Sequence, residues 1–198
     1  MRLNKRKAGG GYRYALYAGI GTFLMATIIS LPLQPAVIRH LSLIIAFPLL
    51  FLIILAGVIF DIIGVAVAVA DETPFNAMAA KKIRGSRQAL WLIRHADRVA
   101  SFTNDIAGDL SATISGAMGA GIIFRVANGL GIPEPLPSII ILGAIAGLTV
   151  GGKAAGKAIA LRRANDITFR VGRIIYLVRE WFPGLDNERG RGFRRGGE

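Results

Sequence analysis

The sequence contains no cysteine and only two histidines, His40 and His95, which lie far apart along the chain. The lack of cysteine excludes a disulfide framework and any thiolate redox or metal chemistry. Two distant imidazoles argue against a zinc enzyme. Nor does the chain show a nucleophile and base in a pattern typical of a hydrolase or transferase. We therefore expect that the protein is not an enzyme.

Acidic residues are also scarce, with 12 Asp and Glu against 24 Lys and Arg and a formal net charge of +12 at pH 7. Such an excess suits nucleic acid or an anionic membrane surface. The basic residues follow the ends of apolar segments with few aromatic residues between them, so we expect no nucleic-acid partner. With 53% hydrophobic residues and a mean hydropathy of +0.52, the composition predicts an all-α, polytopic membrane protein.

Four apolar segments reach the length of about 20 residues that a membrane-spanning helix needs. They are residues 14–33, 41–70, 99–124 and 137–160. The first follows a basic stretch, but its apolar run exceeds the roughly 7–15 residues of a signal peptide's core, which predicts a retained helix. We divide the chain into a basic N-terminus with an extra transmembrane helix (1–40), a transmembrane domain (41–160), a juxtamembrane amphipathic helix (161–183) and a disordered basic tail (184–198).

The distribution of Lys and Arg predicts the orientation of these four helices. Basic residues are concentrated before the first segment, between the second and third, and after the fourth, whereas the other two connections carry only Arg39 and Arg125. Under the positive-inside rule, both termini and the connection between the second and third helices are cytoplasmic. We therefore expect a multi-pass protein of the cell membrane, attracted to its anionic headgroups.

The cytoplasmic connection, residues 74–97, is predicted to form a pair of helices. Thr73 and Pro74 provide a hydroxyl N-cap and a proline at the first helical position of a helix that runs to about residue 83. Gly85 and Ser86 are expected to end it, and a second helix is expected over residues 87–96.

A basic amphipathic helix is predicted after the fourth apolar segment. Apolar residues recur at helical spacing from Ile167 to Trp181, whereas Arg170, Arg173 and Arg179 fall on other faces. Two interpretations remain open, a helix lying along the inner leaflet with its arginines towards lipid headgroups, and a helix packed on another protein domain.

Small residues at every fourth position predict close helix packing in the membrane. One such stripe lies in the third segment and one in the fourth: Gly108, Ala112, Gly116 and Ala120, and Gly143, Gly147 and Gly151.

The predicted site consists of charged residues within the apolar segments, where charge is by default a sign of function. Asp105 and Asp109 are separated by four residues, and Lys153 lies in the glycine-rich fourth segment. Two carboxylates at membrane depth need compensation by a lysine or a metal ion. A hard cation such as Mg²⁺ would find oxygen ligands there, including Asn104 and carbonyls exposed at a backbone turn near Gly152 and Gly156. A purely structural Asp–Lys153 pair, or an Asp105 solvated near the cytoplasmic end, are the alternatives.

The order of these features is similar to that of a known family. Four stretches follow one another along the chain: Phe60-Asp-Ile-Ile-Gly-Val-Ala66, His95-Ala-Asp-Arg98, the polar run of residues 103–113, and Gly152-Lys-Ala-Ala-Gly-Lys157. They resemble successive elements of the membrane domain of the CorB/CorC and cyclin M (CNNM) magnesium transporters. The resemblance covers about residues 42 to 183. It implies a homodimer that transports Mg²⁺, or a similar cation such as Co²⁺.

In the alignment that this resemblance suggests, Asp61 stands near a family serine, and Asn104, Asp105 and Asp109 near family asparagines that bind the ion. Gly64 and Lys153 replace two family glutamates, and Gly156 replaces a proline. The CBS domain pair is missing, so ATP is not expected. Two functions follow as hypotheses: a cation transporter in which Lys153 is a movable counter-ion, and a non-transporting membrane scaffold or regulator with a degenerate ion site.

Overall fold

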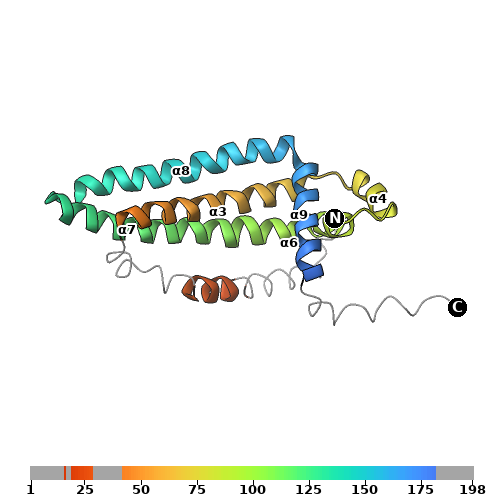
Figure 1. The fold of residues 1–198 in the computed structure, drawn as a ribbon, viewed down its shortest axis with the longest axis horizontal. Coiled ribbons are helices and arrows are strands. Elements are labelled where there is room, and N and C mark those ends of the chain that lie inside the picture. Colours follow the sequence, from red (N-terminus) through yellow and green to blue (C-terminus); the bar gives the residue numbers. More distant parts are fainter. Residues whose placement is uncertain (1–15, 17–18, 29–41, 182–198) are drawn as a thin grey trace, which may run out of the picture. The chain divides into compact units, whose positions relative to one another are not determined.

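The computed structural model describes residue 16 and residues 19–28 and 42–181, except for the side chain of Asp105. Within these residues the chain is helical and contains no strand, which confirms the all-α prediction (Figure 1). The chain forms two compact units. The first contains Ser101–Lys157 and the described residues up to Ile62, and the second contains Ile63–Ala100 and the described residues from Ala158 onward.

Three helices are long and apolar enough to cross a membrane. They are α3 (Leu43–Val69), α8 (Pro135–Arg162), and the 35-residue run Ala96–Leu130, made up of α6 (Ala96–Ala100), the π-helix η1 (Ser101–Gly108) and α7 (Asp109–Leu130). They correspond to the second, fourth and third predicted segments. The third ends at Leu130, six residues later than predicted, and is followed by Gly131, whose φ of 64° suits a glycine C-cap.

Of the first predicted segment, residues 14–33, the structure describes a helix only over Gly19–Ile28, which is too short to cross a bilayer by itself. Apart from residue 16, the rest of that segment, the basic N-terminus before it and all residues after Trp181 lie outside the described residues. A fourth span therefore stays a prediction.

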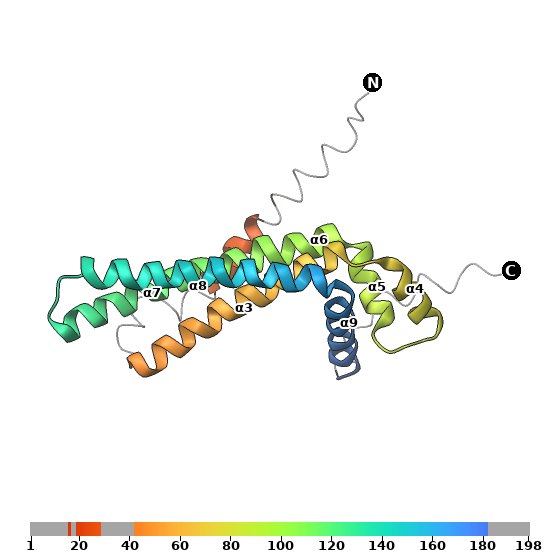
Figure 2. The same cartoon turned by 90° about the horizontal axis from the view of Figure 1, so that it is seen from above.

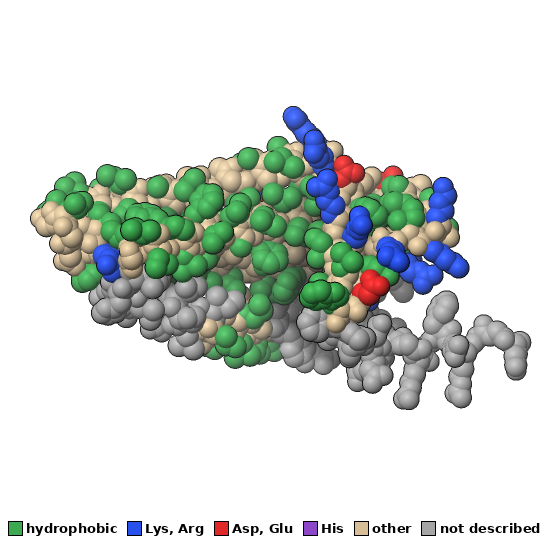
Figure 3. Space-filling view, viewed as in Figure 1, with side chains coloured by type: hydrophobic (Ala, Val, Ile, Leu, Met, Phe, Trp, Pro, Cys, Tyr) green, Lys and Arg blue, Asp and Glu red, His purple; other side chains and the backbone are tan. Residues whose placement is uncertain are grey.

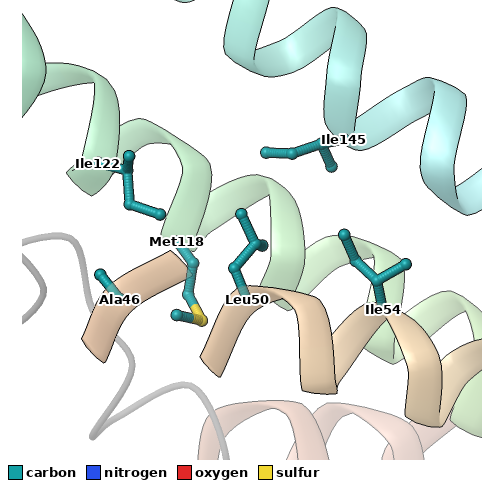
Figure 4. Close-up of a cluster of buried hydrophobic side chains, with 6 residues drawn as sticks. All are labelled: Ala46, Leu50, Ile54, Met118, Ile122 and Ile145. Carbon is teal, nitrogen blue, oxygen red and sulfur yellow. The ribbon is translucent and has the colours of Figure 1, made fainter. Parts of the chain in front are cut away.

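The core of the first unit is a cluster of aliphatic side chains from α3, α7 and α8 (Figure 4). Its members are Ala46, Leu50, Ile54, Met118, Ile122 and Ile145. Many other large apolar side chains of these helices are exposed, among them Ile44, Ile139 and Ile140, each at more than 70%. In the space-filling view, hydrophobic side chains are spread along the visible face of the long helices (Figure 3). Such exposure suits a surface in contact with hydrocarbon.

Glycines bring the helices of the first unit close together, but these are not the glycines of the predicted stripe on α8. A Cβ added at Gly152 would lie 2.9 Å from Val58 Cγ2, and one added at Gly156 would lie 2.7 Å from Ile62 Cγ1, so α8 packs tightly on α3. Nothing lies within 4 Å of the corresponding positions at Gly143, Gly147 and Gly151. The face with Gly152 and Gly156, rotated by one residue from the predicted stripe, is the packed one.

In the second unit, α4 (Glu72–Ala80) packs on α5 (Ser86–Arg94), and α5 packs on α9 (Ala164–Trp181) (Figure 2). The two helices are separated as predicted, but the break covers residues 81–85: α4 ends at Ala80, three residues earlier than predicted, and Ser86 is already the first residue of α5. The predicted N-cap is wrong: Asp71, not Thr73, caps α4, and its carboxylate accepts a hydrogen bond of 2.9 Å from the Thr73 N–H. Aspartate is a strong N-cap, and Pro74 still falls within the first turn, where its missing N–H costs little.

Helix α9 has two different faces. Thr168 and Gly172 are buried, and a Cβ at Gly172 would lie 2.7 Å from the Ala89 Cβ, so this face packs on α5 of the same chain. Four apolar residues at helical spacing remain exposed on α9: Ile174, Leu177, Val178 and Trp181. The predicted amphipathic helix is therefore present, and its packing partner is α5.

Candidate functional site

The site lies in the first unit, where Lys153 of α8 reaches between two carboxylates. Its Nζ lies 3.9 Å from Asp61 Oδ1 on α3 and 3.7 Å from Asp109 Oδ1 on α7. Both distances are too long for a direct hydrogen bond, so the contacts are electrostatic. Asp61 is enclosed, with 7% of its side chain exposed, whereas the Asp109 side chain is 77% exposed. The ammonium therefore lies between one enclosed and one exposed carboxylate.

Small residues make room for this ammonium. A Cβ added at Gly108, the last residue of η1, would lie 3.3 Å from Lys153 Nζ and 3.6 Å from Asp61 Oδ1. On α8, Gly152 precedes the lysine and Gly156 follows it, and both let α8 approach α3. The lysine stem is thus held between helices whose backbones lie close together.

Three buried oxygens of this unit have no hydrogen-bond partner in the described chain: Asp61 Oδ2, Asn104 Oδ1 and Thr149 Oγ1. Buried polar atoms of this kind are uncommon, because each costs free energy that a partner would recover. Thr149 lies one helical turn before Lys153 on α8, and Asn104 lies on η1. These three oxygens are therefore free to accept a hydrogen bond.

The crevice beside the ammonium is lined by residues of all three helices, including Gly57, Ser111 and Thr149, and it is too narrow to hold a water molecule. The Ser111 and Ser115 hydroxyls donate to the carbonyls of Ala107 and Ser111 on their own helix. In this arrangement Lys153 occupies the space between the acids.

The structure therefore brings together Asp61, Asp109 and Lys153, three of the predicted site residues. Asn104 is partly buried in the same unit, and the side chain of Asp105 lies outside the described residues. No group of three or more His, Cys, Asp or Glu within the described part of the chain is arranged to hold a metal ion.

Two features of the predicted site need correction. The backbone turn expected at Gly152 and Gly156 is instead part of the continuous helix α8, so the carbonyls there belong to regular helical hydrogen bonding, and these glycines serve close packing. The segment with Asn104 and Asp105 is a π-helix, so the α-helical spacing used to place Asp105 and Asp109 on one face does not apply within it. Such π-helical segments often occur at functional sites.

Sequence reasoning missed Gly108 and Thr149. Thr149 precedes Lys153 by four residues, a spacing that places both on one face of an α-helix and marks it as a neighbour of the lysine. Gly108 carried a weaker signal, since it was assigned only to a packing stripe.

Three helices with the length and apolar character of membrane spans, surrounding a buried acid–lysine pair, define the class to which this chain belongs: helical proteins suited to a membrane. No protein-family model, curated protein or solved structure matches the chain. The similarity to magnesium transporters therefore rests on the order of the sequence segments alone.

Proposed function

We propose that the protein is an integral membrane protein, with both termini cytoplasmic, that transports a divalent cation between α3, α7 and α8, with Mg²⁺ the first choice and Co²⁺ the second. The observation that carries the proposal is the position of the Lys153 ammonium between the carboxylates of Asp61 and Asp109. In this reading Lys153 is a displaceable counter-ion. The homodimer that the family resemblance implies stays a prediction.

Charge balance favours a divalent cation. Two ionised carboxylates and one ammonium leave a net charge of −1, whereas two carboxylates and one divalent ion, with the ammonium withdrawn, are neutral. Neutrality matters because the interior of a membrane protein penalises uncompensated charge. Lysine suits the exchange, since its flexible stem can carry the ammonium away from the acids.

Ligand chemistry points the same way. Mg²⁺ and similar hard cations take oxygen ligands. Asp61 Oδ2 and Asn104 Oδ1 are buried oxygens without partners, and the exposed Asp109 carboxylate offers a point of entry. Transport would require the crevice to widen, because a cation would have to replace the ammonium there.

The second candidate function is a non-transporting membrane scaffold or regulator. The observation that favours it is the narrowness of the crevice, together with the lack of a three-acid cluster among the described residues. In that case the Asp61–Lys153 pair would only hold α8 against α3.

Cation flux separates the two candidates. We would reconstitute the full chain into liposomes loaded with a Mg²⁺-sensitive dye and compare the wild type with Asp61→Asn and Lys153→Gln. The matched control is Asp166→Asn, which removes an exposed carboxylate of α9 in the second unit. The proposal expects flux in the wild type and the control, none in Asp61→Asn, and altered flux in Lys153→Gln, because the internal competitor is gone.

A wild-type flux no greater than that of protein-free liposomes would rule out transport of the ion and leave the scaffold function. Equal flux in the wild type and Asp61→Asn would show that any conduction bypasses this site.

A further inference from the structure

A basic pocket lies in the second unit, between the α4–α5 turn and α9. It has a volume of about 310 Å³ and is lined by the cationic residues Lys82, Arg84 and Arg87 together with Gln88 and Tyr176. None of the described residues that line it carries a carboxylate. Every polar side chain named here can donate a hydrogen bond, and three of them carry positive charge.

These three positive charges are not neutralised within the described part of the chain. The ion pair found there in the second unit joins Arg94 to Glu72, at 2.8 Å, and no carboxylate lies within 4 Å of Lys82, Arg84 or Arg87. Three like charges around one hollow repel each other, and an anion would relieve that repulsion.

The pocket is built on close backbone contacts. Gly85 adopts a φ of 88°, and a Cβ there would lie 2.7 Å from the Arg173 Cα, so the turn touches the backbone of α9 directly. Lys82 has a φ of 54°, which is uncommon for a residue with a side chain. The turn also leaves the N-terminus of α5 without a side-chain cap, which adds partial positive charge near the pocket.

An apolar surface adjoins the basic pocket. A second hollow of about 330 Å³ shares Arg87 and Gln88 with the first and adds Trp91, Ile175 and Arg179. Trp91 is 49% exposed. The exposed apolar stripe of α9 (Ile174, Leu177, Val178 and Trp181) lies on the other side of that helix, and none of its residues lines either hollow.

We propose that this pocket binds a phosphate group, with Arg84 and Arg87 donating charge-assisted hydrogen bonds, Lys82 supplying a further charge and the Tyr176 hydroxyl donating to a phosphate oxygen. Phosphate matches the donors because it carries negative charge on several acceptor oxygens. A phospholipid headgroup is the favoured source, because its acyl chains would meet the apolar side chains of Trp91 and Ile175 in the adjoining hollow.

The test uses the full chain in detergent with Trp181→Phe, which leaves Trp91 as the sole tryptophan of the two in the sequence. The fluorescence of Trp91 is followed while dihexanoyl phosphatidic acid, dihexanoyl phosphatidylcholine or inorganic phosphate is added. Arg87→Gln removes a pocket cation, and Arg170→Gln, the matched control, removes an exposed cation of α9 outside both hollows. Both positions are exposed, so neither change disturbs packing.

We expect phosphatidic acid to bind, Arg87→Gln to weaken its binding about tenfold or more, and Arg170→Gln to change it less than about twofold. If inorganic phosphate binds with the same dependence on Arg87, the pocket takes a soluble phosphate; if only the lipid binds, it takes a headgroup. The proposal is overturned if neither phosphate probe binds, if phosphatidylcholine binds as tightly as phosphatidic acid, or if both Arg variants weaken binding equally.

Discussion

Replacing Lys153 by methionine removes the ammonium but keeps an unbranched side chain of similar length, and it should destabilise the first unit strongly. Asp61 would then be an uncompensated charge with only 7% of its side chain exposed. At 3.9 Å and an effective dielectric constant near 20, the lost attraction is about 4 kcal/mol. Loss of one partner of a fully buried pair generally costs about 3–5 kcal/mol, and the Coulomb value is an upper bound here because 23% of the Lys153 side chain is exposed to solvent. The contact with exposed Asp109 adds at most about 1 kcal/mol.

The measurement is the free energy of unfolding of the full chain in mixed micelles, followed by circular dichroism. Lys157→Met is the matched control, because Lys157 is an exposed lysine one turn further along α8. The double variant Asp61→Asn with Lys153→Met should recover most of the loss, since no unpaired charge remains. A loss below about 1 kcal/mol for Lys153→Met, or no recovery in the double variant, would refute the assignment of a buried pair.

Two further predictions concern packing and pH. Gly156→Ala should destabilise the chain by about 1–3 kcal/mol, because the new Cβ would meet Ile62 at 2.7 Å. Gly147→Ala on the same helix faces open space and should instead stabilise the chain by about 0.5–1 kcal/mol in the same unfolding assay, because alanine favours the helix more than glycine does. The hydrogen bond from Arg94 lowers the pKa of Glu72 below its ordinary 4.5. The stability from this contact is therefore complete above that value and is lost as the pH falls through the lowered pKa of the folded protein. The unfolding midpoint of Glu72→Gln should therefore not show this loss of stability at low pH. Identical pH profiles of the midpoint for the variant and the wild type would contradict the prediction.

The positions of the long helices were predictable from sequence, because an unbroken apolar run specifies a buried or membrane-spanning helix whatever it packs against. Residues 41–70 and 137–160 became α3 and α8 with shifts of one or two residues at each end. Helix ends depend on local chemistry, and here two good capping residues, Asp71 and Thr73, stand two positions apart. Sequence alone did not decide which one caps α4.

The arrangement of the site was less predictable, because it depends on how each helix is rotated about its axis. Helix α8 carries glycines on two adjacent faces, and the sequence does not say which of them meets α3. The pairing of Lys153 with Asp61 follows from that choice. Asp61 entered the predicted site only through family resemblance, and no periodicity rule reveals the π-helix before Asp109.

The continuity of α8 through Lys153 sets a condition on any ion that enters. The backbone of Lys153 is part of a regular, hydrogen-bonded α-helix, so the ammonium can move only by rotation about the bonds of the lysine side chain. In the proposed transport, an incoming cation would compete with the Lys153 ammonium, whose effective concentration beside the acids does not depend on the surrounding solution because it is covalently attached there.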